Sequence, residues 1–548
     1  MLILHENLSN RPELPEMNAE HKEGFQDRRK KIASNAMHEL LAALHLHRGG
    51  CGPTETVGLS DAVLERFLLS SGDLQSAITE ALSLYPELSE FSCLSEQEVI
   101  RSNTAGFCVF YPSVYRQPFV PVAARGSWVV TLHGAVLNDA GGYGMMGLGH
   151  SPASVVAAMG KPVVMGNIIT PSLSHGKFIK AMRSEIGHTR DSCPYDEFLL
   201  MNSGSEANSV VDRIMDSCLG HLAYGSTHAA SGSTTQDAVF QSEKEKKTIV
   251  MKGGFHGRTF APAVWTESSS KNYQKHKCAR ILKAKTQEII VVELNNVAEL
   301  IQAFATNEVG LVVLEGVMGE GNPGVGVTAE FYKTARELCD KYNAFILVDS
   351  VQAGYRTHGV LSITDYPGFG ELSPPDFEVF SKAINAGQYP VSVVAMTKRA
   401  ASWHKPGIYG NTMTGNPRAC EVVVAVVKAV TNELRENVKD VGKYAVEKFT
   451  ELKKEFPVEI THVTGTGLLY AVHLNKDAVG DVVDNGVERW MRVHGIGVIH
   501  GGENALRFTP PFNFTHSEVD LQVDTLRACL RSRPDSVLPL KVEISKNH

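Results

Sequence analysis

The chain has 548 residues, of which 43% are hydrophobic, and a formal net charge of −7 at pH 7. This length exceeds one ordinary domain, and the apolar content is sufficient to fill large cores. The net negative charge gives no sign of the basic surface that nucleic-acid-binding proteins use. We therefore expect no nucleic-acid partner and favour small-molecule chemistry.

The cysteines and the apolar runs bear on the compartment. Nine cysteines are scattered from Cys51 to Cys529 without a Cys-x-x-Cys pair, which argues against a disulfide framework and a zinc module. No apolar run approaches the ~18 residues of a membrane span. The acidic residues near the N-terminus are unlike a transit peptide. We therefore expect a cytoplasmic protein with reduced cysteines and no membrane association.

The N-terminal part of the chain is predicted to be helical. Residues 1 to about 30 are polar and charged, as in a flexible lead. Apolar residues between Ile32 and His47 recur at the spacing of an amphipathic helix, and helical patterns follow over Asp61 to Leu69 and Gly72 to Leu84. Residues 1–105 are therefore predicted to form a helical extension of unassigned role.

The remainder shows short apolar runs that alternate with helical stretches, which is typical of a largely parallel sheet covered on both faces. The candidate strands are Glu197–Met201, Thr248–Lys252, Glu288–Glu293, Gly310–Glu315, Phe345–Asp349, Phe377–Phe380 and Val391–Met396. A Ser/Thr/Gly/Ala-rich stretch between Gly220 and Lys247 is predicted to be a surface insertion. Patterns that return from about Val438 predict a smaller C-terminal lobe.

Two loops after predicted strands carry residues suited to ligand binding. Asn202-Ser-Gly-Ser-Glu-Ala-Asn opens a helix, so its backbone N–H groups could cradle a phosphate; a turn capped by Ser205 is the alternative. In Gly253-Gly-Phe-His-Gly-Arg-Thr, Phe255 could stack on a ring and Arg258 could hold a carboxylate, although packing and solvation are the commoner roles of such residues. His256 could tune a cofactor or simply pack.

Lys382 follows one predicted strand, and Asp349 ends another 33 positions earlier. An amine that forms a Schiff base and a carboxylate that keeps a pyridine nitrogen protonated are the groups that pyridoxal phosphate (PLP) needs most from a protein. Taken singly, such a lysine is usually solvated and such an aspartate is often a helix cap. Together with the two preceding loops, the pair predicts a PLP site.

These motifs resemble those of the class III aminotransferases, the group that contains 4-aminobutyrate, ornithine, acetylornithine and lysine 6-aminotransferases. The resemblance spans about residues 106–535, with five motifs in the family's order. It implies an α/β fold of PLP fold type I, with a large domain built on a mostly parallel seven-stranded sheet. The expected division is an N-terminal segment of the small domain at 106–165, the large domain at 166–435 and a smaller α+β C-terminal domain at 436–548.

The resemblance also implies roles for single residues. Lys382 would be the Schiff-base lysine and the proton-transferring base, and Asp349 would pair with the pyridine nitrogen. The other expected cofactor contacts are Ser203, Gly204 and Ser205 at the phosphate, Val351 and Phe255 on the two ring faces, Gln352 near the ring hydroxyl, and His256. Thr412 would reach the phosphate of a neighbouring subunit, which makes the active unit at least a homodimer.

The substrate contacts that the resemblance implies are Arg507, Glu320 and Arg258. Arg507 would take the α-carboxylate of glutamate or 2-oxoglutarate, Glu320 would pair with Arg507 when an ω-amine binds, and Arg258 would take the distal carboxylate. A removable ion pair is physically sensible, because a buried arginine left without a partner costs about 3–5 kcal/mol. No metal is expected, because no histidines have metal-binding spacing with supporting carboxylates.

Three positions depart from the family pattern. Ser350 stands where the family commonly has a glutamate, so a carboxylate behind Asp349 is lost. Met318 replaces an amide near the cofactor, and Gly316 replaces a proline, which is expected to loosen its loop.

The expected activity is a ping-pong transamination between an ω-amino acid or diamine-type amine and the 2-oxoglutarate/glutamate couple. An aminomutase or a decarboxylating transaminase on the same scaffold remains the alternative enzyme. A catalytically degenerate binding or regulatory protein, with residues 1–105 as its interaction surface, is the alternative from another class.

Overall fold

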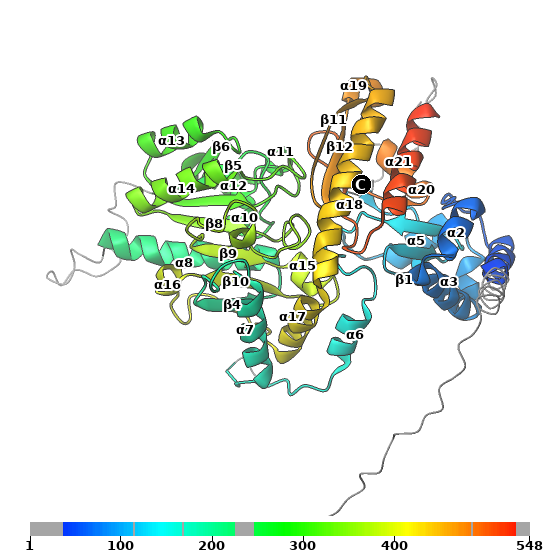
Figure 1. Ribbon diagram of the computed structural model, residues 1–548, viewed down its shortest axis with the longest axis horizontal. Helices are drawn as coiled ribbons and strands as arrows, with labels where there is room; N and C mark the ends of the chain where they lie inside the picture. Colours follow the sequence, from blue (N-terminus) through cyan, green and yellow to red (C-terminus); the bar gives the residue numbers. More distant parts are fainter. Residues whose placement is uncertain (1–36, 113–114, 167–168, 225–245, 484–485, 533–548) are drawn as a thin grey trace, which may run out of the picture.

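The computed structural model describes residues 37–112, 115–166, 169–224, 246–483 and 486–532 (Figure 1). The predicted flexible lead and most of the predicted insertion at 220–247 lie outside these ranges. Within the described part, no helix has both the length and the apolar character needed to cross a membrane.

A seven-stranded sheet forms the centre of the larger half of the molecule, with the strand order β4-β10-β9-β8-β7-β5-β6. Its strands are β4 (Glu197–Met201), β5 (Lys247–Met251), β6 (Ile289–Val292), β7 (Val309–Glu315), β8 (Phe345–Asp349), β9 (Phe377–Phe380) and β10 (Ser392–Met396). Only β10 runs antiparallel to its neighbours. The seven predicted strands and the α/β fold are thus confirmed, with bounds within one residue of the prediction.

Alternate residues of the central strands enter two separate cores. Phe345 and Leu347 of β8 pack with helix α8 (Gly204–Tyr224). Ile346 and Val348 pack on the other face with α13 (Val297–Thr306) and α14 (Ala329–Tyr342). Burial on both faces explains the continuous apolar runs of these strands. By the same alternation, Asp349 at the end of β8 belongs to the face covered by α8.

The other helices of this half frame the sheet and connect it to the rest of the chain. They are α6 (Ala153–Gly160), α7 (Leu173–Glu185), α10 (Phe260–Trp265), α11 (Ser270–Lys275), α12 (Ala279–Glu288), η3 (Ile363–Asp365), α15 (Lys382–Asn385), α16 (Lys398–Ala401) and α17 (Pro417–Ala429). One sequence-based boundary is corrected here. Helix α8 continues to Tyr224, so the first residues of the predicted insertion are helical.

Two four-stranded sheets build the smaller half. One has the order β1-β2-β3-β13 and the other β11-β12-β15-β14. Their strands are β1 (Pro121–Arg125), β2 (Trp128–Thr131), β3 (Val136–Asp139), β11 (Ile460–Thr466), β12 (Leu469–Leu474), β13 (Ile496–Gly497), β14 (Ile499–Gly501) and β15 (Ala505–Phe508). Strand β13 pairs in parallel with β3, so chain segments more than 350 residues apart share one sheet. The predicted domain boundaries stay predictions.

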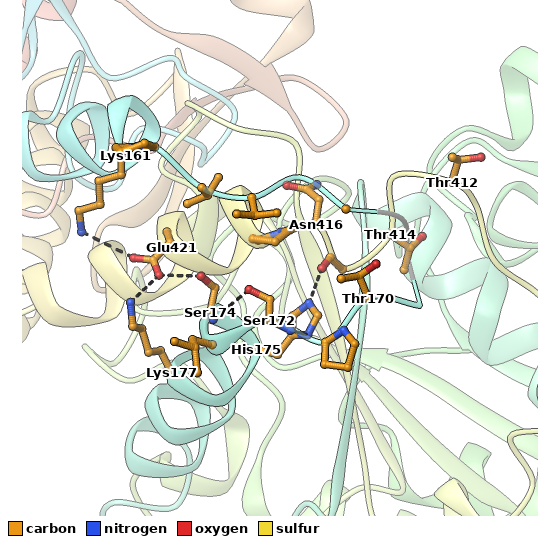
Figure 2. A pocket seen from close by; sticks show the side chains of 18 residues that line it. Lys161, Thr170, Ser172, Ser174, His175, Lys177, Thr412, Thr414, Asn416 and Glu421 are labelled. Carbon is orange, nitrogen blue, oxygen red and sulfur yellow. Dashed lines mark hydrogen bonds and ion pairs between the residues drawn. The ribbon is translucent and has the colours of Figure 1, made fainter.

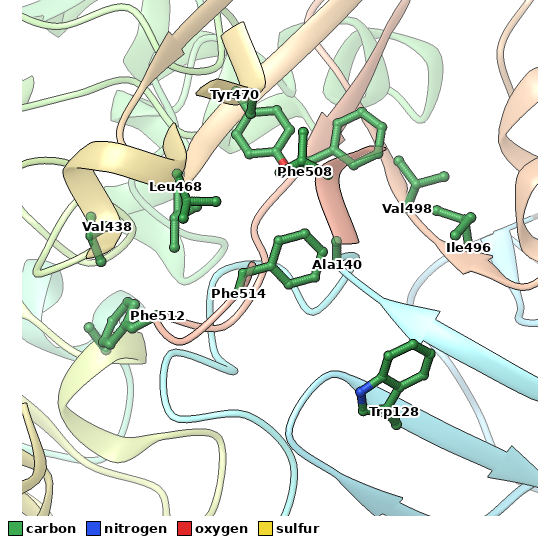
Figure 3. Packing of buried hydrophobic residues seen from close by; sticks show 14 of the residues in the cluster. Trp128, Ala140, Val438, Leu468, Tyr470, Ile496, Val498, Phe508, Phe512 and Phe514 are labelled. Carbon is green, nitrogen blue, oxygen red and sulfur yellow. The ribbon is translucent and has the colours of Figure 1, made fainter. Parts of the chain in front are cut away.

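Buried aromatic residues hold this half together. Tyr470 and Phe508 stack with their ring centroids 5.2 Å apart, and Phe449 of α18 (Asn432–Glu455) packs on both rings (Figure 3). Phe512 and Phe514 belong to the same core. The remaining helices here are α19 (Lys476–Val479), α20 (Val487–Val493) and α21 (His516–Arg531). This packing fixes β15 and the loop after it, which carry Arg507.

The N-terminal extension packs on the β1-β2-β3-β13 sheet, at the end of the molecule away from the large sheet. Residues 37–49 are helical and are followed by α2 (Asp61–Leu68), α3 (Gly72–Leu84), η1 (Tyr85–Leu88), α4 (Ser89–Ser92) and α5 (Glu96–Thr104). The predicted helices at 61–69 and 72–84 are confirmed. Helix α3 covers β1 and β2, and the Tyr85 hydroxyl donates a hydrogen bond to the Thr131 carbonyl at 2.9 Å.

Candidate active site

The predicted site residues follow the ends of strands in one sheet. Asn202 to Ser205 come after β4, Gly253 to Arg258 after β5, the 316–320 loop after β7, Asp349 to Gln352 after β8, and Lys382 after β9. These five strands point the same way, so their carboxyl ends meet at one edge. Ligands of open α/β sheets bind at this edge.

Asp349 is buried and held on both oxygens. Its Oδ2 accepts hydrogen bonds from Asn208 Nδ2 at 2.9 Å and from His256 Nδ1 at 3.0 Å, and its Oδ1 accepts from the Val351 N–H at 3.1 Å. The backbone of His256 is also held in place. Its N–H donates a hydrogen bond to Thr266 Oγ1, and its carbonyl accepts one from Asn208 Nδ2. A carboxylate oriented in this way suits a pyridinium N–H. Asn208 was part of the predicted phosphate motif, but its role at Asp349 was missed.

Lys382 begins the short helix α15 directly after β9. Burial and, to a smaller extent, the positive charge of Arg507 lower the pKa of its amine from 10.5 to about 8, against the opposing effects of Glu320, Asp349 and Glu315. A lysine with this pKa has a substantial neutral fraction near physiological pH and can act as a nucleophile or a base.

The start of α8 has the features of a phosphate cradle. Ser205 Oγ accepts from the Arg258 N–H at 3.2 Å, which brings the loops after β4 and β5 together. At Gly257, whose φ is 121°, a Cβ atom would lie 2.3 Å from Ser205 Oγ, and at Gly204 it would lie 2.9 Å from Val351 Cγ2. Gly204 and Ser205 are the first two residues of α8, so their N–H groups precede the intrahelical hydrogen bonds. Free N–H groups at a helix N-terminus fit the phosphate of PLP.

A second carboxylate, Glu315, was missed as a site residue. It lies opposite Asp349 in the β7–β8 register and is buried. Its oxygens accept from the Phe255 N–H at 3.1 Å and from the Gly319 N–H at 2.8 Å, so it joins two loops of the site. Burial, which dominates, and the nearby Asp349 charge raise its pKa to about 7. Its position at the end of an apolar run, like that of Asp349, was the available signal.

Arg507 is 2% exposed and has no carboxylate within 4 Å among the described residues. It donates hydrogen bonds to the Gly319 carbonyl and, at 3.4 Å, to Gln352 Oε1. The expected ion pair between Arg507 and Glu320 is therefore absent from this structure. The guanidinium is held by the carbonyl next to Glu320 instead, and the Glu320 carbonyl accepts from the Gly502 N–H at 2.7 Å. The pairing on substrate binding stays a prediction.

Arg258 lies against aromatic rings rather than against a carboxylate. Its guanidinium carbon is 5.5 Å from the ring centroid of Phe255, 5.3 Å from that of Tyr111 and 5.7 Å from that of Phe110. Tyr111 stacks on Tyr143 at 5.9 Å, and Arg507 lies 5.7 Å from the Tyr143 ring. A row of rings thus connects the two arginines. The sequence analysis missed both tyrosines, because no local pattern relates them to the motifs.

Thr412 is exposed and lines a cavity of about 730 Å³ together with residues of the 161–166, 170–177 and 414–417 segments (Figure 2). Its neighbour Asn411 accepts a hydrogen bond from Asn202 Nδ2 at 3.1 Å, so this loop also touches the predicted phosphate motif. Large apolar side chains near the cavity face solvent, with Val164 84% and Leu173 88% exposed.

The structure explains the three departures. Ser350 donates a hydrogen bond to Glu378 at 2.6 Å. The Gly316 carbonyl accepts from the Val327 N–H at 3.0 Å, and a Cβ atom at Gly316 would lie 3.1 Å from the Tyr366 hydroxyl, while the expected loosening of the loop stays a prediction. Met318 is buried and packs close to Gly253.

Comparison with known proteins agrees with this geometry. The family model described as aminotransferase class-III matches residues 110–530. The acetylornithine aminotransferase of Vibrio vulnificus is 29% identical over 420 residues, which cover 75% of this chain and 93% of that protein. Ornithine aminotransferase 2 of Staphylococcus aureus is 30% identical over 281 residues, or 51% of this chain and 65% of that protein.

Solved structures show the same fold. The ornithine aminotransferase of Toxoplasma gondii, whose structure has PLP in partial occupancy at its active site, matches with a TM-score of 0.65 and 23% identity, over 80% of this chain and 96% of that one. The N-acetylornithine aminotransferase of Stenotrophomonas maltophilia matches with a TM-score of 0.58 and 23% identity, over 79% and 98%.

The family match covers most of the chain, and the arrangement of Lys382, Asp349 and the start of α8 at one sheet edge is compatible with it. The chain belongs to the class III aminotransferase family and catalyses PLP-dependent transamination. The resemblance found in the sequence, the fold type and the cofactor are thus confirmed.

The lowered pKa of Lys382 predicts how apo-protein takes up PLP. Only the neutral amine attacks the cofactor aldehyde. The rate of PLP association should therefore increase with pH, and the midpoint of this increase should lie near 8, because the pKa of Lys382 is about 8. Arg507→Met removes a positive charge and should move the midpoint upward. Stopped-flow absorbance on dialysed protein measures both profiles.

Lys285 provides a matched control. Its pKa is also lowered to about 8 by burial, but its amine donates to the Val264 and Thr266 carbonyls away from the site. Lys285→Arg should leave the midpoint unchanged. A wild-type midpoint near that of free lysine would contradict the assignment of Lys382.

Proposed function

We propose that this enzyme transfers the amino group of an ω-amino acid or diamine-type amine to 2-oxoglutarate by a ping-pong mechanism through Lys382. One observation carries the proposal. Two arginines, Arg507 and Arg258, have no carboxylate partner among the described residues and are connected by a row of aromatic rings. Two free guanidinium groups suit the two carboxylates of glutamate and 2-oxoglutarate.

The residues around Lys382 have complementary roles in this reaction. When bound, PLP supplies an electron sink for the carbanion formed at the amine-bearing carbon. Asp349 would keep the ring nitrogen of the bound group protonated. Lys382 would hold that group through its amine and, once the substrate amine has displaced it, its neutral amine would take up the substrate proton and return it. Val351 and Phe255 would hold the two ring faces, Gln352 would bind near the ring hydroxyl, and Ser203, Gly204 and Ser205 would hold the phosphate, with His256 behind Asp349.

Substrate exchange requires Arg507 to serve two substrates in turn. It takes the α-carboxylate in the glutamate half-reaction, with Arg258 at the distal carboxylate. An ω-amine lacks a carboxylate at that position, and Glu320 then neutralises Arg507. The support for this switch is sequence position and proximity, since Glu320 follows Gly319, the carbonyl of which accepts from Arg507.

The half-reactions are separable by absorbance. Purified enzyme with PLP should show a visible band that L-glutamate bleaches in the absence of any keto acid, and 2-oxoglutarate should restore it. The productive member of a panel of ω-amino acids and diamines should bleach the band equally. The Lys382→Ala variant should show neither the bleaching by amines nor the restoration by 2-oxoglutarate.

The alternative enzymes give different products. Bleaching without release of the keto or aldehyde product, or turnover that needs no external keto acid, would contradict the proposal in favour of an aminomutase. Release of carbon dioxide would indicate a decarboxylating transaminase, and a band unaffected by every amine would indicate a degenerate binding protein.

We also propose a cytoplasmic homodimer in which Thr412 contacts the phosphate bound by the other subunit. Exposed apolar residues next to the cavity of Thr412, such as Val164 and Leu173, support a subunit interface there. The hydrogen bond between Asn411 and Asn202 supports an interface adjacent to the phosphate cradle.

Mixing two inactive variants tests the shared site. Lys382→Ala and Thr412→Val subunits each lack one essential group, but a mixed dimer contains one site with both if Thr412 acts across the interface. Random reassortment then restores about a quarter of the wild-type sites. If Thr412 serves its own subunit, the mixture stays as inactive as its components.

A further inference from the structure

Glu378 is a fully buried carboxylate on the face of the large sheet opposite to that of Asp349. It lies behind residues 350–354, which we call the cofactor turn. Glu378 is the second residue of β9 and is 0% exposed. In the parallel β8–β9 register it lies beside Val348, whereas Asp349 lies beside Val379. Side chains alternate along strands, so Glu378 and Ser350 project to the same face and Asp349 to the other.

Glu378 accepts four hydrogen bonds from three separate segments. Ser350 Oγ donates at 2.6 Å and Ser362 Oγ at 2.5 Å, the Ile363 N–H at 2.8 Å and the Tyr195 hydroxyl at 2.7 Å. Every one of its partners is itself buried. A buried carboxylate is tolerated only when its oxygens are satisfied in this way, and such charge-assisted bonds are stronger than neutral ones.

The hydrogen bond from Ser350 connects Glu378 to the cofactor turn. Ser350 is the residue after Asp349, and its N–H and hydroxyl both bond to β9, the former to the Val379 carbonyl at 2.9 Å. Its carbonyl accepts from Gly354 at 2.9 Å, which closes the turn from Ser350 to Gly354. This turn carries Val351 and Gln352 on the cofactor side. Anchoring Ser350 therefore sets the position of the whole turn.

We infer that Glu378 is a positioning residue for the PLP site, which acts through Ser350 and supplies from the neighbouring strand the carboxylate that position 350 lacks. It touches neither PLP nor substrate. Its contribution is to hold Asp349, Val351 and Gln352 in place from behind, while β9, which carries it, ends next to Lys382.

Two buried serines provide a matched pair for the test, because each donates one hydroxyl hydrogen bond to the same carboxylate. Ser350→Ala cuts the connection to the cofactor turn, and Ser362→Ala cuts the connection to η3 on the other side. Ser350→Ala should lower the thermal melting temperature of the apo-protein, and Ser362→Ala should lower it at least as much, because the Ser362 hydroxyl also accepts from the Thr364 N–H at 3.1 Å. Only Ser350→Ala should weaken PLP, by about tenfold in the dissociation constant measured by equilibrium dialysis, as expected for one bond to a charged group.

A double-mutant cycle with Glu378→Gln tests whether the effect passes through Glu378. Glu378→Gln keeps the shape of the side chain and should itself weaken PLP. In that background, Ser350→Ala should change the PLP dissociation constant by less than about twofold, because the bond it removes is already weakened. If the Glu378→Gln chain fails to fold, the two serine variants alone decide.

The outcomes separate this role from the site assignment on which it rests. Equal PLP affinity of Ser350→Ala and Ser362→Ala, or an undiminished Ser350→Ala effect in the Glu378→Gln background, would overturn the positioning role while the site stands. If Lys382→Ala kept the visible band of bound PLP, the site assignment itself would fail, and the positioning role with it.

Discussion

The hydrogen bonds that fix Asp349 are the interaction on which the active site depends. A carboxylate at a strand end is free to rotate, but this one is held by Asn208, His256 and the Val351 N–H. Asn208 belongs to α8, whose first residues are proposed to bind the phosphate. One polar contact thus joins the carboxylate proposed to bind the ring nitrogen to the helix proposed to bind the phosphate.

Buried positive charge is the second organising feature. Arg507 and Arg356 are both buried without a carboxylate partner in the described residues, and Arg356 instead donates to the Gly144, Leu468 and Pro510 carbonyls. Burial lowers the pKa of Arg356 to about 9. Such cations are costly to bury, so their presence near Lys382 favours anionic ligands. Arg507 also lowers the pKa of Lys382, so the residue proposed to bind the substrate carboxylate also affects the reactivity of the amine.

The strands and the strand-end residues were predictable because both have local signals. Apolar runs bounded by turn residues located all seven strands, and Asp349 and Lys382 stood out where two runs end. Asn208 and Glu315 carried local signals that were not interpreted. Tyr111, Tyr143 and Glu378 had none, because their roles arise from contacts between segments that only the fold brings together. The Arg507–Glu320 ion pair was expected but is absent for the same reason. Arg507 binds the Gly319 backbone carbonyl instead, and a sequence motif gives no information about the position of a backbone group.

The most direct test of this account is proton exchange at the amine-bearing carbon in Asp349→Ala. Without the carboxylate at the ring nitrogen, exchange of the glutamate α-hydrogen with deuterated water, followed by NMR, should slow by about a hundredfold or more. PLP occupancy should change far less, because the phosphate cradle and Lys382 remain. Exchange near the wild-type rate in PLP-loaded Asp349→Ala would contradict the role of Asp349 and the arrangement built around it.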